Sequence, residues 1–335
     1  MSTSCAPTLA WVRLPPLSPR AYRYLVAATL ASLVFIMVTG AAVRLTDSGL
    51  GCSTWPSCES DSFTPRSASD THGMVEWVNR VITASVGLLT VAAVLGARAR
   101  RPYRADLFRW SLGLPAWVFA NGLVGALVVW LHLAPASVIG HFLLSLAAVW
   151  NAVVLYERAG EDLAEGSGRA GGRRALATAP VVGACKLLLV AAGLVIVTGT
   201  LVTGSGPHAG DERADRLDLV VGDVVRIHGV AMVLFLALTL AIIWMAHDGD
   251  AAPRVEDRLR QLVVVLVAQA GIGYWQYFSG VPALLVGIHV FGAALVWIAV
   301  LRVWFSLSEP VGATTTAPAP GLQRPVDRLP TGARE

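Results

Sequence analysis

Long apolar stretches separated by short polar segments dominate this 335-residue chain. Residues 110–156 contain no Asp, Glu, Lys or Arg. As one helix rising about 1.5 Å per residue, this stretch would be roughly twice as long as the ~30 Å hydrocarbon thickness of a bilayer. It therefore predicts two membrane-crossing helices with a turn near Pro135. A second charge-free run, residues 261–301, predicts two more with a turn near Pro282.

Four further apolar stretches begin near Tyr24, Gly73, Pro180 and Val220, which brings the total to eight. The chain is 55% hydrophobic and only 14% charged, a composition that excludes an ordinary soluble domain. We expect an all-α membrane protein whose eight transmembrane helices form two pseudo-symmetric four-helix bundles. The expected divisions are an N-terminal tail (1–23), a first half (24–157), a linker (158–179), a second half (180–305) and a disordered tail (306–335).

Basic residues gather on one side of the expected helices. The two ends of the chain and three loops on that side contain 19 of the 26 Lys and Arg residues, and the opposite loops contain three. The positive-inside rule then places both termini in the cytoplasm of a multi-pass protein in the plasma membrane, with the lipid bilayer as its surroundings. No cleavable signal peptide is expected, because the first apolar run is long enough to span. The net charge of +4 reflects this topology, and no pattern indicates nucleic-acid binding.

The two halves repeat each other. The segment TGAAVRLTDSGLG, from Thr39, is echoed by TGTLVTGSGPHAG, from Thr198. Four polar positions also recur, one on each even-numbered helix: Asn79 and His141 are 62 residues apart, and His228 and His289 are 61 apart. Each lies about six to eight residues inside its helix, roughly 10 Å below the outer boundary. Two imidazoles at matched depth on facing helices are typical of axial ligands to a heme iron. The alternative is that each histidine only hydrogen-bonds a neighbouring helix.

The second apolar helix contains a carboxylate, in the segment HGMVEWVNR. Glu76 and Asn79 share a helical face, and His72 lies one turn further out on much the same face. A carboxylate inside a membrane span has to be paired, protonated or functional. Arg80 is four residues away, so a purely structural ion pair and a role in catalysis or proton handling both remain open.

Several segments together resemble the heme A synthase family, membrane enzymes that convert heme O to heme A. They cover most of residues 24–303 in the family's order: TGAAVRLTDSGLGCSTWPSC, VEWVNR, GHFLLS, TGSGPHAGD, RIHG and PALLVGIHVFGA. The resemblance implies that His228 and His289 bind heme b, that His141 binds the substrate heme, and that Glu76 is catalytic. The implied reaction oxidises a ring methyl of heme O to a formyl group through a hydroxymethyl intermediate, and it supplies heme A for terminal oxidase assembly.

Asn79 departs from the family pattern, because many members have a second substrate-heme histidine at this position. Three explanations compete for the substrate pocket, which also includes Arg80. His141 binds the iron alone, which we favour; His72 replaces the missing ligand; or Asn79 binds weakly. His72 lies about 10 Å further along the helix axis, so its use requires the heme or the helix to shift outward.

Other candidate residues lie at the outer face. Cys52 and Cys58 share the first outer loop, where an oxidising environment favours a disulfide. It acts either as a staple or, as the family suggests, in redox chemistry. Arg44 and Arg226 are candidates for binding heme propionates or lipid headgroups. Expected partners include a heme O synthase and oxidase assembly proteins. The alternative functions are a diheme b-type electron-transfer protein and a heme carrier that performs no porphyrin chemistry.

Overall fold

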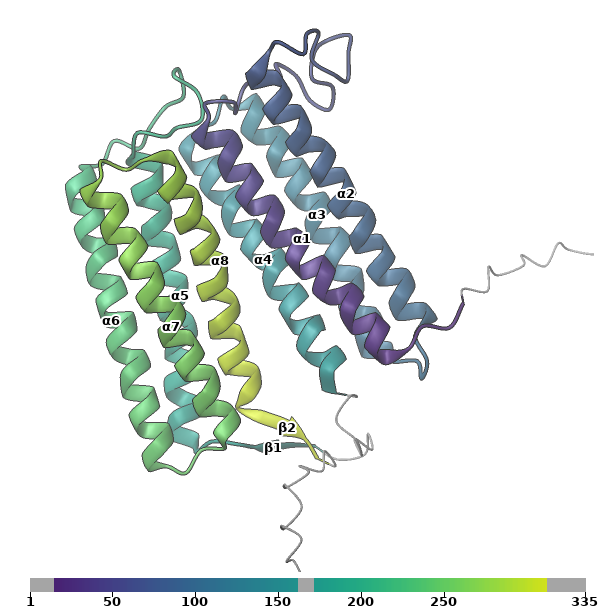
Figure 1. Ribbon diagram of the computed structural model, residues 1–335, viewed down its shortest axis with the longest axis vertical. Coiled ribbons are helices and arrows are strands. Elements are labelled where there is room, and N and C mark those ends of the chain that lie inside the picture. The colour runs from purple at the N-terminus through teal and green to yellow at the C-terminus, as the bar shows by residue number, and fades with distance from the viewer. Residues whose placement is uncertain (1–14, 162–171, 312–335) are drawn as a thin grey trace, which may run out of the picture.

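The computed structural model describes residues 15–161 and 172–311. Its described part contains eight long helices, α1 Pro19–Leu45, α2 Thr71–Ala99, α3 Ala105–Trp130, α4 Pro135–Gly160, α5 Ala179–Ser205, α6 Val221–Asp248, α7 Pro253–Phe278 and α8 Ala283–Ser306. Figure 1 shows them as two four-helix bundles side by side, α1–α4 and α5–α8. The all-α architecture in two halves is therefore confirmed. Most of the expected N-terminal and C-terminal tails, and residues 162–171 of the expected linker, lie outside the described residues.

Seven of these eight helices are long and apolar enough to cross a membrane. The exception is α7, whose first two turns contain five charged residues between Arg254 and Arg260 and whose charge-free part contains three glutamines. The rest of α7 is free of charge and packs against α6 and α8, so it completes the second bundle. The sequence placed the start of this span at the charge-free run, and the helix begins two turns earlier.

Local sequence explains where the helices begin. Proline occupies one of the first two positions of α1, α4, α5 and α7, where its missing N–H leaves no hydrogen bond unmade. The Asp70 side chain accepts a hydrogen bond from the Gly73 amide at 3.0 Å and caps α2. The two predicted hairpin turns are confirmed, since α4 begins at Pro135 and Pro282 directly precedes α8.

Two apolar cores fill the bundles, and they meet at a seam between the halves. The first core is formed by α1–α4 with Ala294 and Leu301 of α8, and the second by α5–α8. Trp297 of α8 packs against both cores, and its indole N–H donates to the Leu146 carbonyl of α4 at 3.1 Å. The two bundles are therefore joined by side-chain packing, with α1 and α4 against α8.

A short strand pair closes the end of the molecule where the described chain begins and ends. β1 (Arg173–Ala175) pairs antiparallel with β2 (Ser308–Pro310). The sequence predicts a linker and a tail without regular structure here, and this expectation is wrong for these six residues. Arg174 pairs with Glu309 at 2.6 Å, so the strands gain an ion pair as well as their backbone hydrogen bonds.

Candidate functional site

The four repeated polar positions lie at similar depths from one end of the molecule. Helices α2, α4, α6 and α8 all begin at this end, which also bears the loops 46–70 and 206–220 (Figure 1). Asn79, His141, His228 and His289 follow the first residue of their helices by six to eight positions. At 1.5 Å per residue this is about 9–12 Å along each helix. The expected depth therefore agrees with the observed helix boundaries.

In the second half, His228 and His289 face each other. Their ring centroids are 6.5 Å apart. Two imidazole nitrogens bound to one metal ion at about 2.0 Å each would hold their ring centroids roughly 6 Å apart. The spacing thus fits an iron between the rings, provided that a porphyrin supplies its remaining ligands. The predicted pair is brought together by the fold.

The two rings differ in their hydrogen-bond contacts. The Nδ1 of His228 lies 3.1 Å from the hydroxyl of Thr198 on α5, which leaves its Nε2 for another partner. The Nδ1 of His289 is buried and has no hydrogen-bond partner in the described residues. Hydrogen bonding at one ring nitrogen fixes the orientation of an iron-bound imidazole, so Thr198 is placed to orient His228.

Glycines make room for both rings. A Cβ atom on Gly199 of α5 would lie 3.1 Å from Cε1 of His228. A Cβ on Gly273 of α7 would lie 3.1 Å from Cε1 of His289. Both contacts would be tight, so a larger residue would force the ring to move. Sequence reasoning missed these glycines, although Gly199 belongs to the repeated TG pair.

The first half repeats this framework with one substitution. The hydroxyl of Thr39 on α1 donates to Oδ1 of Asn79 at 2.8 Å, just as Thr198 contacts His228 in the second half. His141 also has a buried Nδ1 without a hydrogen-bond partner in the described part of the chain. A Cβ on Gly125 of α3 would lie 3.5 Å from its Cε1, which is an ordinary contact. Asn79 therefore occupies the slot that His228 fills in the second half.

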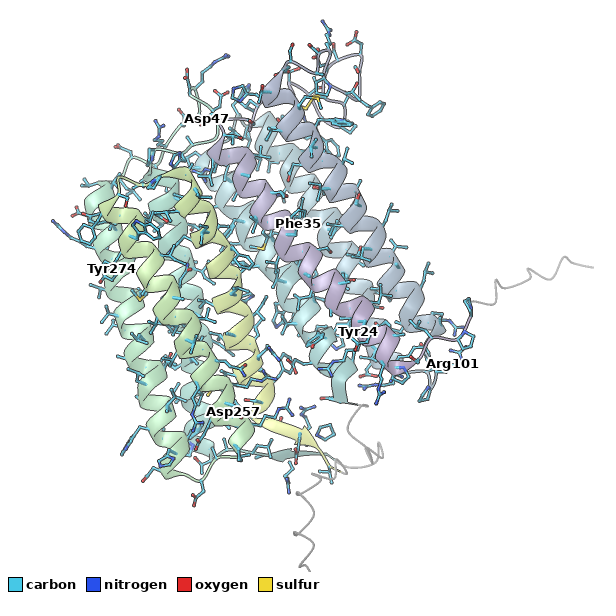
Figure 2. The ribbon with its side chains drawn as sticks, viewed as in Figure 1. Tyr24, Phe35, Asp47, Arg101, Asp257 and Tyr274 are labelled. Carbon is cyan, nitrogen blue, oxygen red and sulfur yellow. A yellow bond between two sulfur atoms is a disulfide. The ribbon has the colours of Figure 1, made fainter. Side chains whose placement is uncertain are left out.

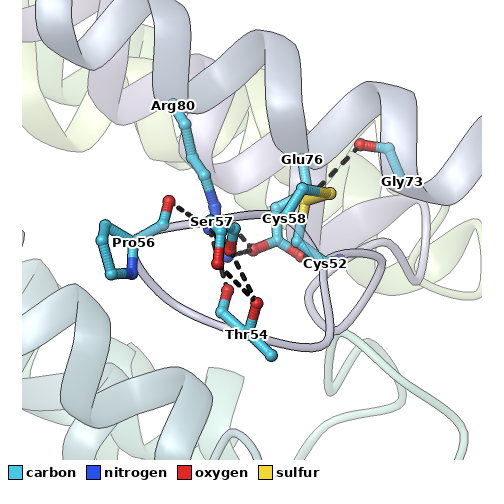
Figure 3. Close-up of polar contacts among 8 residues, drawn as sticks. All are labelled: Cys52, Thr54, Pro56, Ser57, Cys58, Gly73, Glu76 and Arg80. Atoms are coloured by element: carbon cyan, nitrogen blue, oxygen red, sulfur yellow. Dashed lines mark hydrogen bonds and ion pairs between the residues drawn. A yellow bond between two sulfur atoms is a disulfide. The ribbon is translucent and has the colours of Figure 1, made fainter. Parts of the chain in front are cut away.

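Glu76 is buried near the N-terminal end of α2, against the loop 46–70 (Figure 3). Its Oε1 accepts hydrogen bonds from Nη2 and Nε of Arg80 at 2.5 and 3.1 Å, and its Oε2 accepts from the Cys52 amide at 2.8 Å. Cys52 and Cys58 form the predicted disulfide. The Glu76–Arg80 ion pair, one of the two alternatives drawn from the sequence, is thus present. Glu76 also binds the disulfide loop through the Cys52 amide.

Arg80 holds the other side of this loop. Its Nη1 donates to the carbonyls of Thr54 and Ser57, both at 3.0 Å, and to that of Pro56 at 3.3 Å (Figure 3). The guanidinium therefore satisfies a carboxylate and three loop carbonyls at once. These loop carbonyls could not be found from the sequence, because no local spacing brings residues 54–57 to Arg80.

The chain matches a family of known proteins over more than half its length. A family model described as COX15-CtaA, cytochrome oxidase assembly protein, matches residues 23–209. The chain belongs to this family. The match extends from α1 to just beyond α5, so Asn79 and His141 lie inside it, and the second-half histidines lie beyond its end.

The relatives of this cytochrome oxidase assembly family member include heme A synthases and a protoheme IX farnesyltransferase. A heme A synthase of Halalkalibacterium halodurans is 23% identical over 276 residues, 80% of this chain and 88% of that protein. One from Exiguobacterium sibiricum is 30% identical over 139 residues, which span 40% of this chain and 46% of that protein. A protoheme IX farnesyltransferase of Haloarcula marismortui is 32% identical over 136 residues, covering 38% of this chain but only 28% of the relative.

Three other predicted site residues of the family member take part in local contacts. His72 is exposed in the first turn of α2, and its Nδ1 lies 3.1 Å from the Ser48 hydroxyl. Arg44 donates to the carbonyls of His208 at 2.6 Å and Thr203 at 3.0 Å, so it joins the C-terminal end of α1 to α5 and the loop that follows α5. The side chain of Arg226 is 82% exposed and pairs with Asp223 at 3.3 Å. A role for Arg44 or Arg226 in binding propionates stays a prediction.

Proposed function

We propose that this chain is a heme A synthase of the plasma membrane, which oxidises one ring methyl of heme O to a formyl group in two steps. The observation that carries the proposal is the facing pair His228 and His289, with ring centroids 6.5 Å apart, in a chain of the cytochrome oxidase assembly family. The similarity to heme A synthases along 80% of the chain supports the reaction. The proposed orientation places both termini in the cytoplasm and both sites in the outer leaflet.

In this proposal the second half holds heme b and the first half holds the substrate. His228 and His289 would hold the iron of heme b, and Thr198 would fix the orientation of the His228 ring. When bound, heme b supplies one-electron redox chemistry. The protein's own contribution there is to fix two imidazoles at matched depth within an apolar bundle.

The substrate heme O lies between α2 and α4, with His141 as its one protein ligand. Asn79 is a poor second ligand, because its carbonyl oxygen already accepts a hydrogen bond from Thr39. His72 is exposed, contacts Ser48 and lies about two helical turns from Asn79, so it is disfavoured as a replacement. Asn79 would then face the bound heme without ligating its iron.

Glu76 is proposed as the proton-handling residue next to this pocket. Conversion of a methyl to a formyl group removes protons as well as electrons, and a buried carboxylate can accept and release them. Glu76 lies one turn from Asn79 on the same face of α2, and Arg80 and the Cys52 amide fix its two oxygens. The disulfide loop covers this carboxylate, with either a stapling or a redox role for Cys52 and Cys58.

The substrate is the product of a heme O synthase, and the product serves cytochrome oxidase assembly, so we propose both as functional neighbours. The partial similarity to a protoheme IX farnesyltransferase and the family's description support this placement. Direct contacts with either partner remain part of the proposal.

Heme chromatography tests the function. The full chain is co-expressed with a heme O synthase in a host that lacks heme A, and the hemes are extracted and separated. A new formyl-heme peak supports the synthase, and unchanged heme O contradicts it. Glu76→Gln should abolish that peak while the heme b spectrum is retained. An electron-transfer protein or a heme carrier would leave the porphyrin unchanged in every variant.

A further inference from the structure

A long apolar groove follows the seam between the two halves, between α1 and α8 with part of α4 as its floor. Its volume is about 1030 Å³, and its lining on α1 extends from Ala27 to Thr46. These residues span about 28 Å along the helix, close to the hydrocarbon thickness of a bilayer. Phe35 lies in the lining and is 56% exposed (Figure 2). The groove therefore opens sideways, toward the surroundings of the bundle.

One end of this groove is strongly basic. Arg302 lines it, and its Nε donates to Glu157 at 3.0 Å. Arg254 of α7 lies 3.9 Å from the same carboxylate. The guanidinium of Arg23 stacks 4.7 Å above the ring of Tyr156, another lining residue. Three helices thus bring guanidinium groups to the end of the bundle near the strand pair.

The positive charge at this end is not balanced by the described residues. Arg258 adds a fourth guanidinium close to Arg254 and Arg302. Glu157 is the one carboxylate paired with this cluster in the described ranges. The nearby acids of α7 are paired elsewhere, since Glu256 and Asp257 both contact Arg260. The buried Nε of Arg23 has no hydrogen-bond partner among the residues described.

We propose that this groove binds one anionic phospholipid. Its acyl chains lie along the α1–α8 seam, and its phosphate lies among Arg23, Arg254 and Arg302. The apolar walls match hydrocarbon along their length, and the excess of guanidinium groups matches a phosphate at one end. A zwitterionic lipid fits less well, because its ammonium group would enter a cluster that is already positive. The proposal does not depend on the reaction at the heme sites.

Native mass spectrometry of the purified full chain tests the site. The protein is stripped of lipid with detergent and then titrated with phosphatidylglycerol or phosphatidylcholine. We expect one phosphatidylglycerol to be retained per chain in preference to phosphatidylcholine. Arg23→Gln should reduce this retention about fivefold, and Arg23→Gln combined with Arg302→Gln should reduce it further. Equal retention of the two lipids, or no retained lipid, overturns the proposal.

A matched control separates the groove from general surface charge. Arg260→Gln removes a guanidinium from the same end of α7, but from a residue paired outside the cluster. Its phosphatidylglycerol retention should equal that of the unaltered chain, and a loss as large as that of Arg23→Gln contradicts the proposed position. Ala31→Phe fills the apolar part without changing any charge, and it should also reduce retention. Circular dichroism checks that each variant remains folded, and undiminished retention by a folded Ala31→Phe variant rules out the groove.

Discussion

The two halves share one framework and differ at one decisive position. In each half, a threonine on the first helix contacts the key residue of the second helix, and a glycine on the third helix faces the histidine of the fourth. The key residue is Asn79 in the first half and His228 in the second. Because the supporting contacts recur in both halves, the main difference lies in the identity of this residue.

This comparison teaches how one duplicated bundle can serve two tasks. A heme bound by two imidazoles has no open side for another ligand, which suits a resident cofactor used for electron transfer. A site with one imidazole leaves a side of the iron open and allows a bound molecule to enter and leave. The first half also has the disulfide loop and the Glu76–Arg80 pair over its site, and the shorter loop 206–220 of the second half contains no cysteine.

The largest effect should follow from removal of a second-half histidine. His289→Ala takes away one of the two proposed axial ligands, so we expect loss of the low-spin b-type spectrum and a fall in retained heme on the order of 100-fold, at the upper end of the effect of outer-shell changes. Optical spectroscopy and heme extraction of the purified protein measure both. His247→Ala is a matched control, because this histidine lies at the opposite end of α6. An unaltered b-type spectrum in His289→Ala would refute the proposed ligation.

The next largest effect should come from restoring symmetry between the halves. Asn79→His places an imidazole opposite His141 in a slot that Thr39 already supports, as Thr198 supports His228. We expect the heme bound in the first half to change from a high-spin to a low-spin state, and its exchange to slow about tenfold. Electron paramagnetic resonance reports the spin state. If the first half already shows two-imidazole ligation with Asn79 present, the comparison drawn here is wrong.

The sequence predicted the eight helices better than the contacts that join them. Apolar stretches and their turns were sufficient to predict eight helices, because crossing a bilayer imposes length and composition directly. The spacing of Glu76 and Arg80 indicated their pairing for a similarly local reason. Arg44 could not be placed in advance, since its partners Thr203 and His208 come from the other half. The three-residue strands were missed because such short segments lack a recognisable period.

A smaller effect should distinguish the glycines that face the two histidines. Gly273→Ala introduces a Cβ 3.1 Å from His289, and Gly125→Ala introduces one 3.5 Å from His141. We therefore expect Gly273→Ala to shift the heme b absorption and weaken heme retention several-fold, and Gly125→Ala to leave the first-half heme nearly unchanged. Gly183→Ala on α5, where nothing lies within 4 Å, controls for the effect of the extra methyl group. Equal effects of Gly273→Ala and Gly125→Ala would show that the difference in glycine-to-histidine distance between the halves has no consequence for heme binding.

The smallest effect should come from the threonines, and it sharpens the comparison most. Thr198→Val removes the hydroxyl 3.1 Å from Nδ1 of His228 and preserves the shape of the side chain. Loss of a partner that orients a metal-bound imidazole weakens metal binding, and a neutral hydroxyl is a weak partner, so heme b retention should fall only about twofold, with its reduction potential shifted. Thr39→Val makes the same change in the first half, where the hydroxyl contacts an amide and not a ligand. It should leave the heme b potential unchanged, because His228 keeps its own threonine. An equal shift of the heme b reduction potential in both variants would mean that the threonines act through packing of the bundle. Orientation of His228 by Thr198 would then no longer account for the properties of heme b.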